Sequence, residues 1–262
     1  MTTTFDSCAF FPQRPDLLRA HARAQGFEPH LHDTFSVVLL HRGSVTLRSH
    51  RGTELVGEGD VFVCNPFEVM SGECQHASVE YDVLYPSARF ARECLGAVVS
   101  RRLLPLLHTM VIRPSETTHE LFGALQSCRR SDAATESALS RLFGECKLDD
   151  GSVASRSFEA VDAACRIIQE QYAQTLDTER LARCASLHTS HFIRVFHRLT
   201  GLAPQTYLRQ VRVSRARQLI CAGAELADVA CQTGFFDQAH LTREFKKIHG
   251  VTPGRFARDV NA

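Results

Sequence analysis

The sequence predicts a two-domain protein, with an antiparallel β-barrel and following helices in its N-terminal part and an all-helical domain in its C-terminal part. Three observations lead to this prediction. Short runs of alternating or β-branched residues, separated by turn residues, fill the stretch from about 35 to 84. A helical spacing of apolar residues replaces that alternation from about residue 88. In the C-terminal part, one pattern of residues occurs twice, at an offset of 48 and then 49 positions.

Length and composition are those of an ordinary globular protein. The chain has 262 residues, of which 44% are hydrophobic and 23% charged, enough for a sizeable core. No apolar run reaches the roughly 18 residues that a membrane span needs, and the first residues lack the pattern of a signal peptide. The ten cysteines contain no C-x-x-C pair, so we expect reduced thiols rather than a disulfide framework. These features predict a cytoplasmic protein without membrane contact.

The N-terminal part carries strand signals and then helix signals. Strands are expected where β-branched or alternating runs are bounded by Gly, Asn or Pro turns, at residues 36–40, 44–48, 60–64 and 79–84. Apolar stripes predict helices between 88 and 147, including one at 116–129, and we expect these helices to supply a homodimer contact. The polar run KLDDGSVASR contains the predicted linker, 151–156, which separates the expected domains 1–150 and 157–262.

Each copy of the C-terminal repeat has the pattern of a short helix, a turn and a longer helix. The two copies cover about 178–200 and 226–249, and the second has one extra residue in its turn. The longer helices have an apolar stripe on one side and polar or basic residues on the other. This arrangement is typical of helix-turn-helix motifs, whose second helix enters the DNA major groove. The basic character of the region agrees: residues 155–262 contain 15 Lys and Arg against 10 Asp and Glu, whereas residues 1–154 contain 15 against 19.

One long helix is expected between the two copies, from Ala203 to Ala222. Pro204 suits its first turn, and Gly223 follows its last residue. A helix of about 18 residues is roughly 27 Å long. It could therefore hold two recognition helices about one turn of DNA apart, which is roughly 34 Å.

The stretch from about Phe158 to Val260 resembles the DNA-binding domain of AraC/XylS transcription regulators. The match is most specific over ACQTGFFDQAHLTREFKKIHGVTPGRF, residues 230–256. Ser186 departs from the family pattern, which commonly has Gly there, and would be strained if the position needs a positive φ. The resemblance and the polar faces together predict DNA contacts from Thr189, Ser190, Ile193, Arg194, Arg198, Gln238, Ala239, His240, Arg243, Lys246 and Lys247.

The stretch from about Phe27 to Pro86 resembles the cupin-like sensory barrel of the same regulators. Its motifs are PHLHD at 29–33 and GEGDVFVCNPFEVM at 57–70. Metal-binding cupins add a Glu and a third His where this chain has Ser36 and Met70, so we expect no metal or other cofactor. The tentative effector pocket consists of His30, His32, Met70 and Tyr81.

These features predict a sequence-specific DNA-binding transcription regulator controlled by a small-molecule effector in the barrel. The expected partners are double-stranded promoter DNA, the effector, a second copy of the chain and RNA polymerase. The resemblance implies a bacterial protein that is nucleoid-associated when bound to DNA. No G-x-S-x-G, P-loop or Ser/His/Asp arrangement points to an enzyme. Two alternatives stay open: a cupin-type metalloenzyme fused to a helical domain, and a regulator whose barrel only dimerises.

Overall fold

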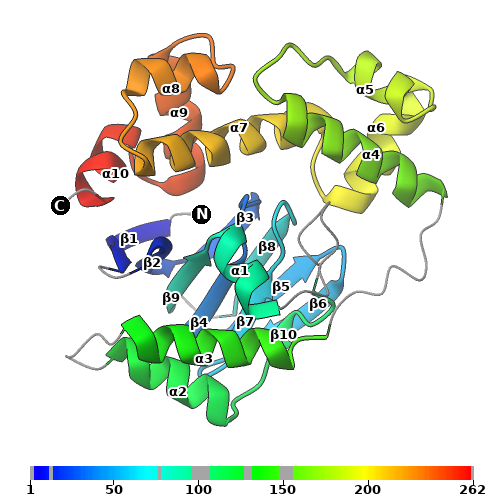
Figure 1. Ribbon diagram of the computed structural model, residues 1–262. Helices are drawn as coiled ribbons and strands as arrows, with labels where there is room; N and C mark the ends of the chain where they lie inside the picture. The colour runs from blue at the N-terminus through cyan, green and yellow to red at the C-terminus, as the bar shows by residue number, and fades with distance from the viewer. Residues whose placement is uncertain are drawn as a thin grey trace. The chain divides into compact units, whose positions relative to one another are not determined.

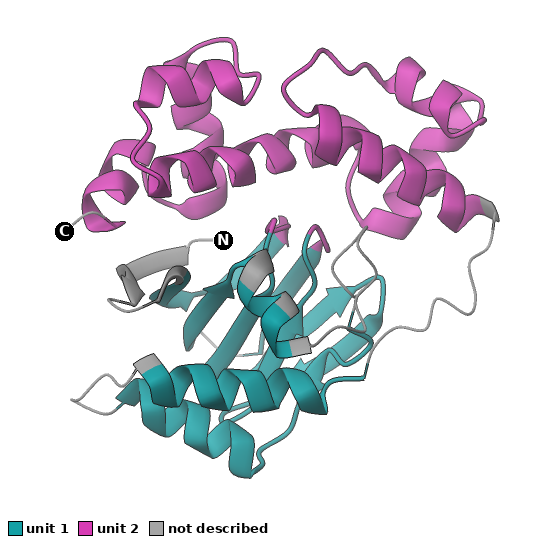
Figure 2. Cartoon of the chain, viewed as in Figure 1, with its two compact units in different colours: residues 1–28, 34–66, 70–150 teal, residues 29–33, 67–69, 151–262 magenta. Residues whose placement is uncertain are grey.

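The structure is a computed structural model, and it describes residues 3–11, 14–75, 78–95, 107–126, 132–147 and 156–260. The chain divides into two compact units (Figure 2). Unit 1 comprises residues 1–28, 34–66 and 70–150, and unit 2 comprises residues 29–33, 67–69 and 151–262. The predicted linker, apart from Arg156, lies outside the described residues. Within the described part of the chain, no helix is both long and apolar enough to cross a lipid bilayer.

Two β-sheets account for most of the described part of unit 1. The six-stranded sheet has the order β1 (Thr3–Phe11), β2 (Arg14–Ala24), β9 (Val79–Pro86), β4 (Ser36–Arg42), β7 (Val61–Cys64) and β10 (Val111–Ile112). The four-stranded sheet has the order β3 (Gly26–His30), β8 (Met70–Cys74), β5 (Val45–Ser49) and β6 (Gly52–Val56). The pairs β2–β9, β4–β9, β4–β7, β5–β6 and β5–β8 are antiparallel. The four strands expected from the sequence are confirmed as β4, β5, β7 and β9.

Strands β1 and β2 were not predicted, because the residue pattern indicated strands only from about residue 35 and the family resemblance began only at about residue 27. In β2 the buried side chains at alternate positions include Ala20, Ala22 and Ala24, and Arg19 and His21 alternate with them. Alanine is depleted in strands, so this alternation has a weak strand signal. The strand forms because its neighbour β9 pairs with it over eight residues, from Leu17 to Ala24.

Three helices cover one face of the six-stranded sheet: α1 (Ala88–Leu95), α2 (Glu116–Gln126) and α3 (Asp132–Glu145) (Figure 1). They confirm the predicted change from strands to helices; residues 127–129 of the predicted helix 116–129 lie outside the described part. The core between sheet and helices includes Leu39 and Leu84 from the strands and Leu139 and Phe143 from α3. Burial of such side chains stabilises the unit by about 1.5–3 kcal/mol each.

Unit 2 is helical apart from its two short N-terminal segments. Its helices are α4 (Arg156–Gln171), α5 (Thr178–Cys184), α6 (Thr189–Thr200), α7 (Pro204–Cys221), α8 (Leu226–Gln232), α9 (Gln238–His249) and α10 (Pro253–Val260). Helices α5 and α6 form the first helix-turn-helix motif, α8 and α9 form the second, and α7 runs between them (Figure 1). Both motifs and the connecting helix agree with the predicted fold.

The two copies of the repeat pack in the same way. In the first, the rings of Phe196 and Tyr207 lie 5.5 Å apart; in the second, the rings of Phe245 and Phe256, 49 positions later, also lie 5.5 Å apart. The longer helix of each copy ends in a left-handed glycine, with φ of 76° and 72°. Equivalent residues therefore produce equivalent local structure, as the repeated sequence indicated.

The turns of the two motifs contain a left-handed residue at matching positions. Ser186 has φ of 54° and Gly234 has φ of 76°. Glycine adopts this conformation without steric cost, whereas serine is strained in it. A Cβ atom at Gly234 would also lie 2.8 Å from the carbonyl oxygen of Ala173. The second turn therefore has two separate reasons to require glycine.

We expect Gly234→Ala to lower the free energy of unfolding by at least about 2 kcal/mol, because it adds left-handed strain and a backbone clash. Ser186→Gly removes strain but adds unfolded-chain entropy, so its effect should stay within about 1 kcal/mol. Urea unfolding followed by circular dichroism measures both. Equal losses in the two variants would contradict the asymmetry between the turns.

Candidate nucleic-acid interface

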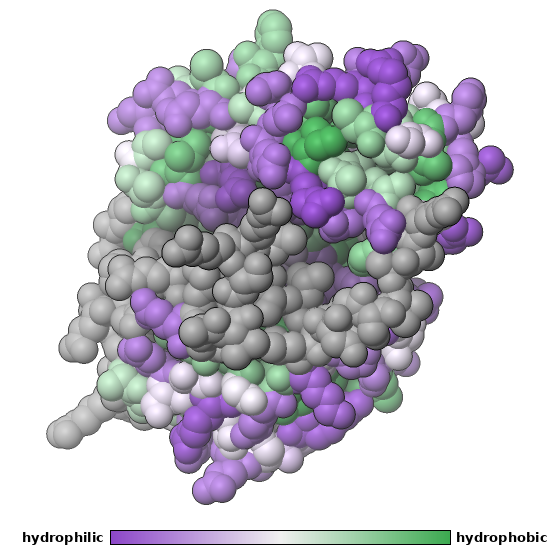
Figure 3. All heavy atoms as spheres, turned by 45° about the vertical axis from the view of Figure 1, so that its right-hand side comes forward, coloured by the Kyte–Doolittle hydropathy of each residue, from purple (hydrophilic) through white to green (hydrophobic). Residues whose placement is uncertain are grey.

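Helices α6 and α9 each have one buried side and one exposed side. Phe192, Val195 and Phe196 of α6 are buried, as are Leu241 and Phe245 of α9. The predicted DNA contacts lie on the other side: exposed are Ser190, Ile193, Arg194, Arg198, Gln238, Ala239, Arg243, Lys246 and Lys247, and half-buried are Thr189 and His240. Figure 3 shows one face of the molecule, on whose upper part hydrophilic residues border a group of hydrophobic ones.

Four basic side chains on these exposed sides are not paired with any other side chain in the described part of the chain. Arg194, Arg243, Lys246 and Lys247 have no ion pair or hydrogen bond to any other described side chain. The acidic residue of α9, Glu244, instead lies 3.7 Å from Arg209 of α7. The positive charges of α9 are therefore available to an anionic partner.

The two longer helices begin differently. The carboxylate of Asp237 accepts a hydrogen bond of 2.6 Å from the backbone N–H of His240, and so caps α9. His188, at the equivalent place before α6, makes no such side-chain bond. The ring of His240 also packs edge-on against Phe235, with 5.2 Å between ring centroids. Part of the His240 ring surface is thus used inside the motif.

Helix α7 is fixed by contacts with the helices of both motifs. It packs against α4 and α6 of the first motif region and against α8, α9 and α10 of the second. The guanidinium of Arg212 donates hydrogen bonds of 2.7 and 2.9 Å to the carbonyl oxygens of Tyr172 and Gln174, in the loop after α4. The connection between the motifs is a packed helix and not a flexible tether.

Residues 29–33 belong to the same unit as α7 and hydrogen-bond to it. The N–H of Leu31 donates to Oε1 of Gln210 at 2.9 Å, and the N–H of Asp33 donates to Oγ of Ser214 at 3.0 Å. The Ser214 hydroxyl donates back to the Asp33 carboxylate at 2.7 Å, and Arg217 lies 3.3 Å from the same oxygen. The buried charge of Asp33 is thereby paired.

The residues of the predicted effector pocket fall into two pairs. His30 and His32 belong to unit 2, with ring centroids 5.0 Å apart, whereas Met70 and Tyr81 are buried side chains of unit 1. The ring of Tyr81 packs edge-on against Phe27, with 5.4 Å between centroids. The structure brings His30 and His32 together. A pocket shared by all four residues stays a prediction.

Two histidines of unit 2, His32 and His249, have surroundings that disfavour the charged form of the ring. Burial lowers the pKa of His32 well below its ordinary value, and the neighbouring His30, Arg217 and His249 lower it further. Burial, followed by Arg217 and His30, lowers the pKa of His249 in the same way. Because the Arg217 charge acts on both rings, their surroundings are unfavourable for a bound cation.

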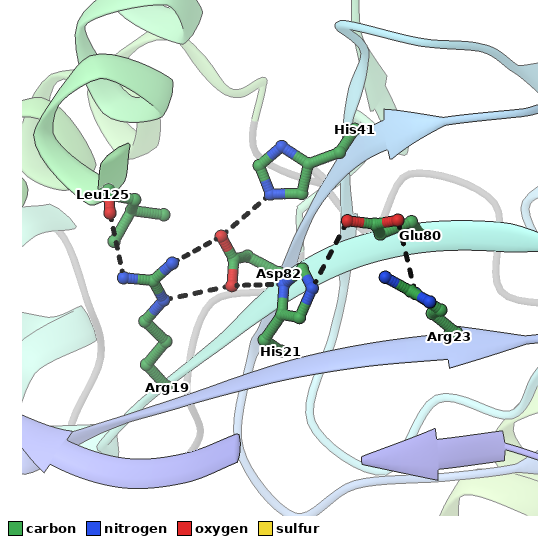
Figure 4. A network of polar contacts seen from close by, with 7 residues as sticks. All are labelled: Arg19, His21, Arg23, His41, Glu80, Asp82 and Leu125. Atoms are coloured by element: carbon green, nitrogen blue, oxygen red, sulfur yellow. Dashed lines mark hydrogen bonds and ion pairs between the residues drawn. The ribbon is translucent and has the colours of Figure 1, made fainter. Parts of the chain in front are cut away.

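A polar network in unit 1 was missed by the sequence analysis (Figure 4). The buried carboxylate of Asp82 accepts two hydrogen bonds from the Arg19 guanidinium, at 3.0 and 2.7 Å. His41 Nε2 lies 2.8 Å and His21 Nδ1 lies 3.3 Å from the same carboxylate. Arg19 also donates a 3.0 Å bond to the carbonyl oxygen of Leu125, in the last turn of α2. The network thus ties helix α2 to the sheet.

Strand pairing explains how these residues meet. His21 of β2 lies directly opposite Asp82 of β9, and His41 falls at an irregularity in the pairing of β4 with β9. Burial would raise the pKa of Asp82, but hydrogen bonds from His41 and Arg19 and the Arg19 charge lower it to about 2. The alternation of Arg19 and His21 with alanines was the signal in the sequence that could have indicated a polar partner on β9.

Ligand atoms of His21, His41 and Asp82 lie within 4.8 Å of one another, as in many cation sites. Both carboxylate oxygens, however, already accept a hydrogen bond from Arg19. A metal ion would have to compete with a bidentate guanidinium, which is among the strongest partners of a carboxylate. The arrangement fits an ion-pair network that stabilises the unit.

We expect Asp82→Asn to lower the free energy of unfolding at pH 7 by about 3 kcal/mol, because it removes the charge that pairs with Arg19. The folded pKa of about 2 is below the ordinary value of 3.8, so the contribution is present above pH 3.8 and is lost as the pH falls towards 2. Between pH 3.8 and pH 2, the free energy of unfolding of Asp82→Asn should therefore fall less than that of the original protein.

The matched control is Glu73→Gln, which breaks an exposed pair with Arg48. Such a pair contributes about 0–1 kcal/mol. Urea unfolding at several pH values measures both variants. Similar losses for Asp82→Asn and Glu73→Gln would show that the network is not a stabilising element.

Comparison with known proteins agrees with an N-terminal β-rich part followed by a helix-turn-helix domain. The family described as "AraC-like ligand binding domain" matches residues 14–143, and a helix-turn-helix domain family matches residues 181–259. The HTH-type transcriptional regulator YbfI of Bacillus subtilis is 24% identical over 83% of this chain and 82% of its own length. The msm operon regulatory protein of Streptococcus mutans is 22% identical over 91% and 89%.

A solved structure shares the fold over nearly the whole chain. The structure of ToxT from Vibrio cholerae, with an unsaturated fatty acid bound, superposes with a TM-score of 0.59 and 13% identity, covering 93% of this chain and 95% of ToxT. Together, the two matched domains, the regulator relatives and the double helix-turn-helix arrangement place this chain in the AraC family of DNA-binding transcription regulators.

Proposed function

We propose that the protein reads its operator with α6 and α9, placed in successive major-groove segments on one side of the duplex, under the control of an organic effector. The observation that carries this proposal is the pair Arg194 and Arg243. These residues are equivalent in the repeat, both are exposed, and neither is paired with another described side chain. A packed helix of about 27 Å separates their motifs.

The chemistry of these side chains suits base reading. A guanidinium can donate two parallel hydrogen bonds to O6 and N7 of guanine, the commonest specific contact in the major groove. Ser190, Gln238 and Ala239 lie in the first turns of the same helices, the part that reaches base edges in helix-turn-helix proteins. Lys246 and Lys247 lie further along α9, and we assign them to phosphate contacts, which position the protein without reading sequence.

The N-terminal part, residues 1–150, is proposed as the effector-binding and dimerisation domain, and residues 157–262 as the DNA-binding domain. The match to a ligand-binding domain family supports the first assignment. ToxT was solved with a fatty acid bound, so an organic effector is a reasonable class for this chain too. We assign the apolar lining to Met70 and Tyr81 and polar contacts to His30 and His32.

Two further partners follow from the same proposal. The helices between residues 88 and 147, which pack on the core of the six-stranded sheet, are proposed to join two copies of the chain. A regulator bound at a promoter would also contact RNA polymerase. The protein is proposed to act in the bacterial cytoplasm, associated with the nucleoid when DNA-bound, and to have no catalytic activity.

Alanine at Arg194 or Arg243 should weaken binding to the preferred site by about 1–3 kcal/mol and relax sequence preference at one position. Alanine at Lys246 or Lys247 should weaken binding to all sequences alike and lower the salt slope by about one charge. Binding of the full chain to a randomised-site DNA library, at several salt concentrations, distinguishes the two behaviours.

A matched control is Arg166→Ala, an exposed arginine of α4 that lies 3.5 Å from Asp162 and outside both motifs. It should leave sequence preference unchanged. If the Arg194 and Arg243 variants keep the preference of the original protein at every position, base reading by this pair is refuted.

A further inference from the structure

The turn of the second motif contains one residue more than the turn of the first. After the left-handed residue, the first motif has Leu187 and then the N-cap His188. The second motif has Phe235, then Phe236, and only then the N-cap Asp237. Leu187 and Phe235 occupy equivalent places, since each N–H bonds to the carbonyl oxygen five residues earlier at 3.0 Å. Phe236 is the inserted residue.

Phe236 has no packing role that the structure reveals. Its side chain is 91% exposed, whereas the adjacent Phe235 is 5% exposed. Among the described large hydrophobic residues, the next most exposed is Leu55, at 56%. An apolar residue just before an N-cap often packs against the fourth helical residue, here Leu241, but that contact would bury the ring. The ring therefore projects from the start of α9 into solvent.

The position of Phe236 is that of a DNA contact. It lies two residues before Gln238 and three before Ala239, which are exposed in the first turn of α9. If α9 enters the major groove by its N-terminal end, as recognition helices do, the ring enters with it. The apolar group that the major groove presents is the C5-methyl of thymine, and phenylalanine is one of the side chains that contacts it.

A protein partner is a poorer fit. Docking surfaces for proteins are contiguous apolar patches of several hundred Å². The other exposed residues within three positions of Phe236 are Asp237, Gln238 and Ala239, two of which are polar and one of which is only a methyl group. A single large ring beside such side chains suits contact with one methyl group.

We propose that Phe236 determines specificity by packing on the C5-methyl of a thymine beside the bases that α9 reads. This inference rests on the proposed function and adds to it a residue that neither the repeat nor the family resemblance indicated. It predicts that the half of the operator read by α9 contains a thymine whose methyl group, and not its hydrogen-bonding edge, is recognised.

The test begins with the operator obtained by in vitro selection with the full chain. Each thymine in turn is replaced by deoxyuridine, which removes the methyl and keeps every hydrogen-bonding group. We expect binding by the original protein to fall about four-fold at one position, the equivalent of one buried methyl group. Phe236→Ala should bind the unmodified operator more weakly by a similar factor, and the deoxyuridine at that position should have no further effect on it.

Phe236→Leu should retain the sensitivity to deoxyuridine, since it keeps an apolar side chain. Leu55→Ala, which removes an exposed apolar side chain of unit 1, should bind like the original protein. The proposal is overturned if Phe236→Ala responds to every deoxyuridine as the original protein does, if it weakens all sites uniformly, or if the α9 half of the operator contains no thymine. Failure of the original protein to select any sequence would instead refute the proposed function, and this inference with it.

Discussion

The arrangement of the helices in unit 2 depends on one constraint: helix α7 is buried on two opposite sides. Val211 and Val213 are both fully buried although they lie two residues apart. At about 100° per residue, side chains two positions apart point to opposite sides of a helix. Helices of both motifs supply the surrounding contacts, so neither motif can turn about α7 without exposing apolar surface. The separation and the relative rotation of α6 and α9 are therefore properties of the folded chain.

The charged residues divide into those used within the protein and those left for a partner. Arg19 in unit 1 and Arg212 in unit 2 direct their guanidinium groups to a carboxylate or to backbone carbonyl oxygens. Arg194 and Arg243 have no such partner in the described residues. An arginine that is hydrogen-bonded inside a protein gains little from a phosphate or a base edge, because it must first lose its existing bonds. Among the described residues, the unpaired arginines therefore include one on each of the two helices that the proposal places in DNA.

The sequence predicted best what depends on local pattern. The second motif was expected at about 226–249, where α8 and α9 lie, because an apolar stripe and a terminal Gly are local signals. The family resemblance raised a positive φ at Ser186 only as a condition, and the structure shows that this condition holds. The Asp82 network escaped prediction because Arg19, His21 and His41 are 41 to 63 residues away from Asp82 and meet it only through strand pairing. The exposure of Phe236 could not be predicted either. Phe235 and Phe236 are the same residue type, and only the fold of the turn decides which of the two rings is buried.

The central claim, that one chain spans two successive major-groove segments through a rigid α7, is tested most directly by changing the distance between the two half-sites. The full chain is titrated with its selected operator and with operators carrying five or about ten extra base pairs between the halves. The account predicts that both insertions reduce affinity to that of a single half-site, because about ten base pairs restore the face of the duplex but add roughly 34 Å that α7 cannot bridge. Full affinity for the operator with ten extra base pairs would contradict a rigid spacer.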